Sequence, residues 1–273
     1  MPTPLVALTI AGVDSAGGAG VHADLRAFAA HGLHGATVVA ALTAQSTRAI
    51  EAVHPVPASF VAAQLDAVLG DLDVRATKTG FLGSAEVVGV VADAAEAGRL
   101  VDLVVDPVLV TSAGTPLFPP EVQRAFVARL LPRARVITPN RTEAGLLVGR
   151  PLPTVSAMAE AAAELLGLGC EAVVVKGGDA EDEGDEAVDV LAVAGRVAHI
   201  VAPRVDTAND HGSGCSFAAS VAARLALGDG VEAAVRSAKA FVHRGLLGAR
   251  DWRLGAGHGP IDAFGWDAPP GAG

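Results

Sequence analysis

The chain has 273 residues, of which 51% are hydrophobic and 4% aromatic, a composition that suits a large folded domain and argues against disorder. Its 30 acidic and 20 basic residues give a formal charge of −10, which disfavours nucleic acid and anionic membranes as partners. Two cysteines are too few for a disulfide framework, and no leader-like segment or apolar run of about 18 residues is found, so we expect a cytoplasmic protein.

Apolar, β-prone runs alternate with Ala-rich helical patterns through most of the chain. The expected strands are 5–11, 36–42, 75–79, 103–106, 135–138 and 172–176. The expected helices between them are 21–30, 58–69, 85–97, 120–131 and 156–166. This alternation predicts an α/β fold with a mostly parallel central sheet and helices on both faces.

The remainder of the chain adds a hairpin and two helices to this pattern. The acidic stretch 180–186 is expected to be a solvated loop, since like charges repel and stay hydrated. Ala194 and Gly195 separate the runs 187–193 and 197–201, which predicts a hairpin. Helices are expected at 215–227 and 231–247, followed by a Gly- and Pro-rich tail over the surface. No repeat or linker interrupts the pattern, so we expect one domain over 1–273.

The strongest local motif is NDHGSGCS, residues 209–216, which precedes an apolar helical run. Glycines at Gly212 and Gly214 allow successive N–H groups, including that of Ser213, to point into one concavity at a helix N-terminus. Such a site favours anions, as phosphoryl transfer requires. The helix terminus is expected to lower the pKa of the Cys215 thiol. The alternative is a Gly-rich turn that caps a core helix.

A second Gly-rich segment, AGVDSAGGAG at 11–20, follows the first strand. It lacks the Gly-Lys-Ser/Thr ending of a Walker A loop and the spacing of a dinucleotide fingerprint. Its place at the carboxyl end of a strand still indicates a ligand-binding region. Asp24 in the following helix is expected either to bind a ligand hydroxyl or to complement the helix dipole.

Gln45 ends the second expected strand. Its carboxamide offers a donor and an acceptor side by side, which matches the edge of an aminopyrimidine. The alternative is an ordinary polar residue at a strand end.

Polar residues follow three further strands: Asp106, the pair Asn140 and Glu143, and Lys176. The carboxyl ends of parallel strands lie at one edge of a sheet, so these side chains are expected to gather there. Asp106 and Glu143 would hold Mg²⁺ directly or through waters, and Lys176 would reach a phosphate. The alternatives are a helix first-turn acid at Glu143 and a turn residue at Asp106.

Three other features carry weaker expectations. Lysine occurs only at Lys78, Lys176 and Lys239, which suggests that each has a role beyond solubility. Cys170 is expected to be a packed, small apolar residue. His211 would either assist Cys215 or be structural or solvated.

Taken together, these motifs resemble the hydroxymethylpyrimidine/phosphomethylpyrimidine kinases, a branch of the ribokinase-like superfamily. The resemblance covers almost the whole chain. It is carried by the segments ALTIAGVDSAGGAGVHADLRAF, ALTAQST, TKTGFLG, VVDPVLV, LLPRARVITPNRTEA, GCEAVVVKGG and HGSGCSFAASVAA.

The resemblance implies a ribokinase-like fold, ATP and Mg²⁺ as cofactors, and a homodimer. It also implies phosphorylation of 4-amino-5-hydroxymethyl-2-methylpyrimidine, and then of its monophosphate, for thiamine biosynthesis. Pyridoxal kinase is the alternative within the same family. A pyrimidine-binding domain without turnover is the alternative outside the enzyme class, although the expected phosphate-binding residues are all present.

The resemblance also implies roles for single residues. The residue matching Gln45 reads the pyrimidine, and the other expected pocket residues are Gly12, Asp24, Phe81 and Val108. The anion hole is expected from Gly212, Ser213, Gly214 and Cys215. Cofactor contacts are expected from Lys176, Asn140 and Asp106, with Glu143 linked to Mg²⁺. The sequence departs from many members at Ser15 (Pro), Phe81 (Met) and Ser213 (Thr), and Phe81 is the departure expected to alter substrate range.

Overall fold

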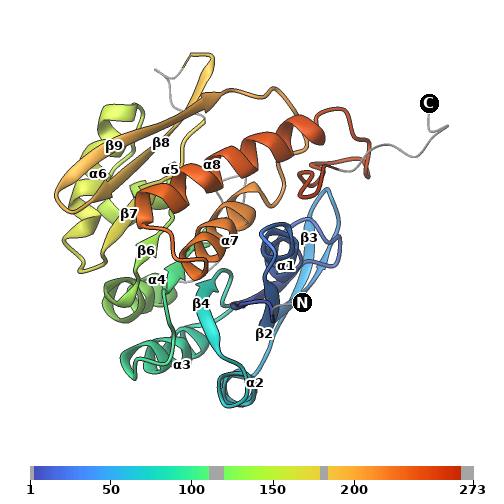
Figure 1. The fold of residues 1–273 in the computed structure, drawn as a ribbon, viewed down its shortest axis with the longest axis vertical. Helices are drawn as coiled ribbons and strands as arrows, with labels where there is room; N and C mark the ends of the chain where they lie inside the picture. Colours follow the sequence, from blue (N-terminus) through green and yellow to red (C-terminus); the bar gives the residue numbers. More distant parts are fainter. Residues whose placement is uncertain (1–2, 111–119, 179–183, 266–273) are drawn as a thin grey trace.

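The computed structural model describes residues 3–110, 120–178 and 184–265, and a mixed sheet of nine strands runs through this part of the chain (Figure 1). The strands are β1 (Val6–Val13), β2 (His34–Gln45), β3 (Ile50–Pro55), β4 (Val74–Thr79), β5 (Val104–Val105), β6 (Val136–Ile137), β7 (Ala172–Val175), β8 (Glu186–Val193) and β9 (Arg196–Pro203). Their order is β3-β2-β1-β4-β5-β6-β7-β8-β9. The pairs from β2 through β7 are parallel, whereas β3, β8 and β9 join antiparallel. The expected mostly parallel sheet is confirmed.

Helices cover both faces of the sheet. One face packs against α2 (Ala58–Leu69), α3 (Ala85–Glu96), α4 (Pro120–Ala125), α5 (Arg141–Val148) and α6 (Val155–Leu166), and the other packs against α1 (Gly20–Ala30), α7 (Ser213–Ala226) and α8 (Val231–Gly248). The apolar side chains between sheet and helices form two cores, as parallel strands buried on both faces require.

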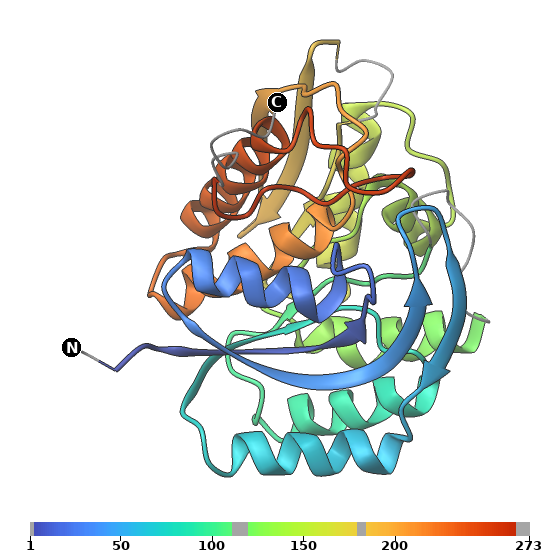
Figure 2. The ribbon, with the colours of Figure 1, turned by 90° about the vertical axis from the view of Figure 1, so that its right-hand side faces the viewer.

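The β2–β3 pair differs from the sequence prediction. β2 is longer than expected, and Figure 2 shows it as a long curved strand with β3 beside it. The prediction misses β3, because all six of its residues are exposed and its charged and polar side chains hide the alternation of a half-buried strand. Its terminal residue, Pro55, is tolerated because β3 is an edge strand.

Two helical regions also differ from the prediction. The expected helix 120–131 is α-helical only to Ala125 and continues as a π-helical turn (Phe126–Leu130) and a 3₁₀ turn (Leu131–Arg133). Pro132 has no N–H and cannot extend an α-helix here. The prediction also misses α5, although Asn140 and Glu143 form the capping box that marks its start.

The remaining predictions have mixed outcomes. The hairpin at Ala194–Gly195 is confirmed, with positive φ at both residues. The acidic stretch lies mostly outside the described residues. The described tail packs on the β2–β3 turn, where Thr47 accepts the N–H of His258 at 2.9 Å.

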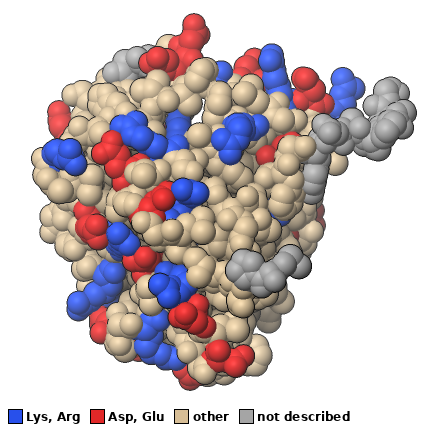
Figure 3. All heavy atoms as spheres, in the orientation of Figure 1, with Lys and Arg blue, Asp and Glu red and all other residues tan. Residues whose placement is uncertain are grey.

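Within the described ranges, no helix is both long and apolar enough to cross a membrane. Figure 3 shows acidic and basic side chains interspersed over one face of the molecule.

Candidate active site

Polar side chains that follow β5, β6 and β7 meet at the carboxyl edge of the sheet. The Nζ of Lys176 lies 2.8 Å from Oδ1 of Asp106, which also accepts a hydrogen bond from Thr138 Oγ1 at 3.1 Å. Asn140 is bridged to Lys176 through the backbone. Burial lowers the pKa of Lys176, but the carboxylates of Asp106 and Glu143 outweigh it, and the net pKa is raised. Lys176 is therefore a firmly charged group at this edge.

Glu143 lies in the first turn of α5 and completes its cap. Its Oε2 accepts the N–H of Asn140 at 2.9 Å, and Asn140 Oδ1 accepts the N–H of Glu143 at 2.8 Å. Its Oε1 accepts the N–H of Leu109 at 3.1 Å. Burial raises the pKa of Glu143 to about 7, although Lys176 opposes this rise. The capping alternative is thus present, and the same carboxylate remains beside Lys176.

The glycine-punctuated turn at 212–214 begins α7. Gly212 adopts a φ of +78° as the N-cap, and a side chain there would collide with the backbone of Gly18. A Cβ atom at Gly214 would stand 3.0 Å from the Nζ of Lys176. The N–H of Ser213 donates to the carbonyl of Asp210 at 3.1 Å. The N–H groups of Gly214 and Cys215, in the first turn of α7, therefore open next to the ammonium group of Lys176.

The thiol of Cys215 lies in the first turn of α7 and accepts a hydrogen bond from the N–H of Gly20. Desolvation raises its pKa to about 11, with Lys78 lowering it in part and Asp24 and Asp106 raising it. The expectation of a lowered pKa is wrong, because desolvation and two carboxylates outweigh the helix terminus and Lys78. Cys215 is a neutral thiol near pH 7.

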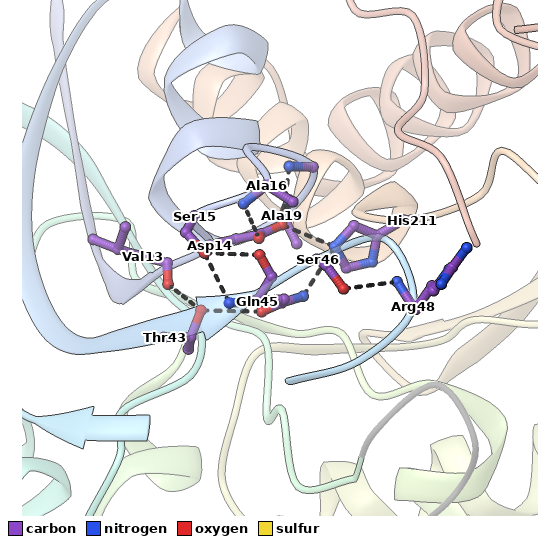
Figure 4. Close-up of polar contacts among 11 residues, drawn as sticks. Val13, Asp14, Ser15, Ala16, Ala19, Thr43, Gln45, Ser46, Arg48 and His211 are labelled. Carbon is purple, nitrogen blue, oxygen red and sulfur yellow. Dashed lines mark hydrogen bonds and ion pairs between the residues drawn. The ribbon is translucent and has the colours of Figure 1, made fainter. Parts of the chain in front are cut away.

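The Gly-rich segment after β1 contacts the end of β2 (Figure 4). Ser15 Oγ donates to the carbonyl of Gln45 and accepts its N–H, both at 2.8 Å. The ring Nε2 of His211 lies 2.9 Å from Asp14 Oδ2 and 3.2 Å from the side-chain amide of Gln45. The residue just before the α7 turn is thus linked to Gln45, and His211 has the structural role that the sequence left open.

Three of the expected pocket residues lie at the ends of neighbouring strands. A Cβ atom at Gly12 would stand 2.9 Å from Cδ1 of Phe81, so the backbone of β1 and this ring are in contact. Val108 is half-buried in the turn after β5, and its N–H donates to the carbonyl of Asp106 at 2.9 Å.

Asp24, the fourth expected pocket residue, is fully buried in α1. Its Oδ2 lies 2.9 Å from Nζ of Lys78 and accepts the hydroxyl of Thr9 at 2.6 Å. Burial raises the pKa of Asp24, and Lys78 offsets part of this rise. Because the side chain has no exposed surface, Asp24 supports the site through its ion pair and presents no surface to a ligand.

All three lysines of the sequence pair with a buried aspartate. Besides the pairs of Lys78 and Lys176, the Nζ of Lys239 lies 3.0 Å from Oδ1 of Asp189. The expectation that each lysine has a role beyond solubility agrees with these pairs. Lys78, Lys239 and Asp14 are absent from the predicted site residues, although the rarity of lysine was a usable signal for two of them.

A cavity of about 410 Å³ opens over the β7 and α7 side of this edge. Its walls include two ammonium groups and the turn before α7; the lining residues include Asn140, Lys176, Asp189, Ser213, Gly214 and Lys239. Ammonium groups and helix N-terminal N–H groups bind phosphate oxygens. The cavity is therefore suited to a polyphosphate.

Two acidic residues at this edge, Asp106 and Glu143, are the candidate ligands for Mg²⁺. Among the described residues, no group of three or more His, Cys, Asp or Glu side chains is arranged to hold a metal ion. The carboxylate of Asp106 is close enough to Glu143 to contribute to the raised pKa of Glu143. Mg²⁺ commonly binds one or two carboxylates and completes its shell with waters and substrate phosphates, so this pair fits that mode of binding.

Comparisons with known proteins show the family of the chain. A family model for phosphomethylpyrimidine kinase matches residues 14–262. The hydroxymethylpyrimidine/phosphomethylpyrimidine kinase of Rhizobium meliloti (strain 1021) is 43% identical over 261 residues, 95% of this chain and 97% of that protein. Among solved structures, the pyridoxal kinase of Bacillus subtilis in an ADP complex has a TM-score of 0.89 and 35% identity, covering 96% of this chain and 98% of that one.

A second solved structure, the phosphomethylpyrimidine kinase of Clostridium difficile 630, has a TM-score of 0.78 and 34% identity, with 88% of this chain and 98% of that chain covered. Family model, sequence relatives and fold agree over most of the length. The chain therefore belongs to the phosphomethylpyrimidine kinase family.

Proposed function

We propose that this chain transfers the γ-phosphoryl group of ATP to the hydroxymethyl oxygen of 4-amino-5-hydroxymethyl-2-methylpyrimidine, and a second one to the resulting monophosphate, for thiamine biosynthesis. The position of the α7 turn carries the proposal. Gly214 lies next to Lys176 on the side of the cavity beside β7 and α7, and His211 contacts Gln45 on the other side. The names of the relatives from R. meliloti and C. difficile support the same reaction.

The proposed mechanism depends on positioning and electrostatics. Lys176 and the N–H groups of Gly214 and Cys215 would stabilise negative charge on the migrating phosphoryl group, while the N–H of Ser213 donates to Asp210 within the turn. Asp106 and Glu143 would hold Mg²⁺, directly or through waters, and the ion would supply positive charge to the phosphate oxygens. Asn140 lines the same cavity as Lys176 and would contact the nucleotide.

The acceptor side is formed by Gln45 with Gly12, Phe81 and Val108. Gln45 would bind the aminopyrimidine edge, and Phe81 would pack on the ring beside Gly12. Because Cys215 is a neutral thiol near pH 7, it cannot take up the proton of the substrate alcohol as a strong base would. Holding the alcohol in line with the phosphate is then the main contribution of this side.

The proposal is tested by ADP release from Mg-ATP in the presence of the pyrimidine. We expect pyrimidine-dependent release, and for Gln45→Ala a KM for the pyrimidine about tenfold higher, because one ligand hydrogen bond to a buried site is worth about 1–3 kcal/mol. The KM for ATP should be unchanged. No ADP release at saturating pyrimidine would leave only a binding function.

Pyridoxal kinase is a second candidate, favoured by the structural likeness to the B. subtilis enzyme. Both substrates are hydroxymethylated aromatic heterocycles. The ratio of kcat/KM for the pyrimidine and for pyridoxal decides between them, and the proposed function requires the pyrimidine to be preferred.

We further propose that the protein is cytoplasmic, as its low cysteine count suggests, and that it forms a homodimer, as the family resemblance suggests. Sedimentation equilibrium should give twice the mass of the chain. A monomer at micromolar concentration would contradict the dimer.

A further inference from the structure

The contacts around Gln45 determine which way its carboxamide faces. The structure places the carboxamide Oε1 3.2 Å from Oγ1 of Thr43 and the carboxamide Nε2 3.2 Å from Nε2 of His211. Rotation of a carboxamide by 180° exchanges its oxygen and nitrogen without moving any other group. The hydrogen-bond partners decide between the two orientations.

The contact with Thr43 favours one orientation. Thr43 Oγ1 lies 2.8 Å from the carbonyl oxygen of Val13, which can only accept. A hydroxyl has a single proton, so Thr43 donates it to Val13 and can only accept from Gln45. The hydroxyl therefore favours the carboxamide rotated by 180°, with its nitrogen toward Thr43.

The contact with His211 favours the same orientation. Asp14 Oδ2 lies 2.9 Å from Nε2 of His211, and the carboxylate also accepts the N–H groups of Ala16, Gly18 and Ala19 at 2.8–2.9 Å. Burial would raise the pKa of Asp14, but the hydrogen bonds from His211 and from the backbone outweigh it and lower the pKa. An ionised Asp14 requires a proton on Nε2 and accepts it. The carboxamide oxygen of Gln45 can share this N–H at 3.2 Å, whereas the carboxamide NH2 would place donor against donor.

We propose that Asp14, Ser15 and His211 are positioning residues that fix the Gln45 carboxamide with its oxygen toward His211 and its nitrogen toward Thr43. Ser15 holds the backbone of Gln45 through two hydrogen bonds of 2.8 Å, and Asp14 holds the side chain through His211 (Figure 4). One oxygen lone pair and one N–H of Gln45 then remain for a ligand in a fixed order.

The His211 ring is itself held in place. Its backbone N–H donates to the carbonyl of Gly259 at 3.0 Å, and its ring is 22% exposed. A Cβ atom at Gly18 would collide with the ring. These contacts hold the ring in place, and His211 directly precedes the turn that begins α7. The same residues therefore join the heterocycle-binding side to the phosphate-binding side.

The inference deepens the proposed function and rests on it. The 4-amino group of the pyrimidine is a hydrogen-bond donor. A carboxamide oxygen of Gln45 held in one position should bind a ligand that carries this group more tightly than a ligand that lacks it. The test measures Kd by calorimetry for the hydroxymethylpyrimidine and for its analogue without the 4-amino group. The proteins are the wild type and the His211→Ala, Gln45→Ala and double variants.

His211→Ala should reduce the preference for the amino compound about tenfold, the size of one lost hydrogen bond of 1.4 kcal/mol. In the Gln45→Ala background the same substitution should leave the remaining preference unchanged, since it acts through Gln45. His211→Gln keeps an N–H near the Nε2 position and should restore most of the preference. Equal loss of affinity for both ligands in both backgrounds would overturn the proposal.

Two further variants keep the test decisive. Ser15→Ala removes an exposed hydroxyl and should reduce the preference for the amino compound by a smaller factor while the protein stays folded. This variant provides the test if His211→Ala does not fold. An unchanged preference in Ser15→Ala would count against the proposal. His258→Ala is the matched control, because His258 also pairs with an aspartate, Asp210, at 2.8 Å but is 64% exposed; it should behave like wild type. Wild-type binding without ADP release would reject the proposed function and leave this inference testable through Kd.

Discussion

At the scale of single residues, the chemistry of the site depends on surroundings that no local motif reveals. The NDHGSGCS motif predicts the position of the turn, and the sequence of strand ends predicts that Asp106 and Lys176 meet. The pKa of Cys215 could not be predicted, because Lys78, Asp24 and Asp106 reach the thiol from three other elements. The local sequence shows that Cys215 lies at a helix N-terminus, but it does not show that the folded protein shields the thiol from water.

A first prediction concerns Cys215. In a Cys170→Ala protein, where Cys215 is the one remaining thiol, alkylation by iodoacetamide should be slow near pH 7 and rise about tenfold per pH unit, because only the thiolate reacts and the pKa is raised to about 11. Mass spectrometry across a pH series gives the rate. A rate that levels off below about pH 8 would show a lowered pKa instead.

A second prediction concerns Asp14 and acid. Its pKa is lowered below the ordinary 3.8 in the folded protein, so its stabilising contribution is complete above 3.8 and is lost as pH falls through the folded pKa. The free energy of unfolding of Asp14→Asn should therefore fall short of the wild type by a constant amount above about pH 5. The gap should close in stronger acid. A gap that widens as the pH falls would reverse the sign of the argument.

At the scale of secondary-structure elements, strongly periodic segments are predicted well and unusual ones are not. α2 occurs at the expected residues, because its apolar pattern is clear. β3 is missed because it has no buried face, and β5 and β6 are shorter than expected because only two residues of each pair with their neighbours. The strand ends matter more for function, and the alternation of strands and helices predicts that the carboxyl ends of the parallel strands lie at one edge of the sheet.

The third prediction separates capping from nucleotide binding at α5. Asn140→Ala removes the cap bond to Glu143 and should lower the free energy of unfolding by about 1 kcal/mol. It should also raise the KM for ATP, since Asn140 lines the same cavity as Lys176.

Thr154→Ala is the matched control for this prediction, because Thr154 caps α6 through the N–H of Ala157 at 3.2 Å and is not among the cavity residues. It should cost a similar free energy of unfolding with no change in the KM for ATP. Equal kinetic effects in both variants would assign the Asn140 effect to helix stability only.

At the scale of the whole molecule, ion pairs lie beneath the carboxyl edge of the sheet and tie α1 and α8, two helices of one layer, to the strands. The pair of Lys78 on β4 with Asp24 on α1 has no exposed surface on either side chain. Hydrophobic composition predicts a core but not charges within it. The rarity of lysine was the one hint in the sequence, and pairing partners far apart in the chain could not be read from it.

The fourth prediction addresses this pair. Lys78→Met leaves the carboxylate of Asp24 buried without its counter-charge and should lower the free energy of unfolding by about 3–5 kcal/mol. The Lys78→Met/Asp24→Asn double variant, which removes both charges, should recover most of this loss. Urea denaturation measures both values. Arg236→Met breaks an exposed pair with Glu232. It is the control and should lower the free energy of unfolding by about 0.5 kcal/mol or less. Equal losses in Lys78→Met and in the Lys78→Met/Asp24→Asn double variant would show that the pairing is unimportant.

The central claim is that the glycine turn before α7 brings phosphoryl donor and pyrimidine acceptor together between Lys176 and Gln45. The most direct measurement is the mass of the product after the chain is incubated with Mg-ATP and 4-amino-5-hydroxymethyl-2-methylpyrimidine. The account predicts a gain of one phosphoryl group and then of a second. A pyrimidine recovered at its starting mass, with pyridoxal phosphorylated in the parallel sample, would contradict it.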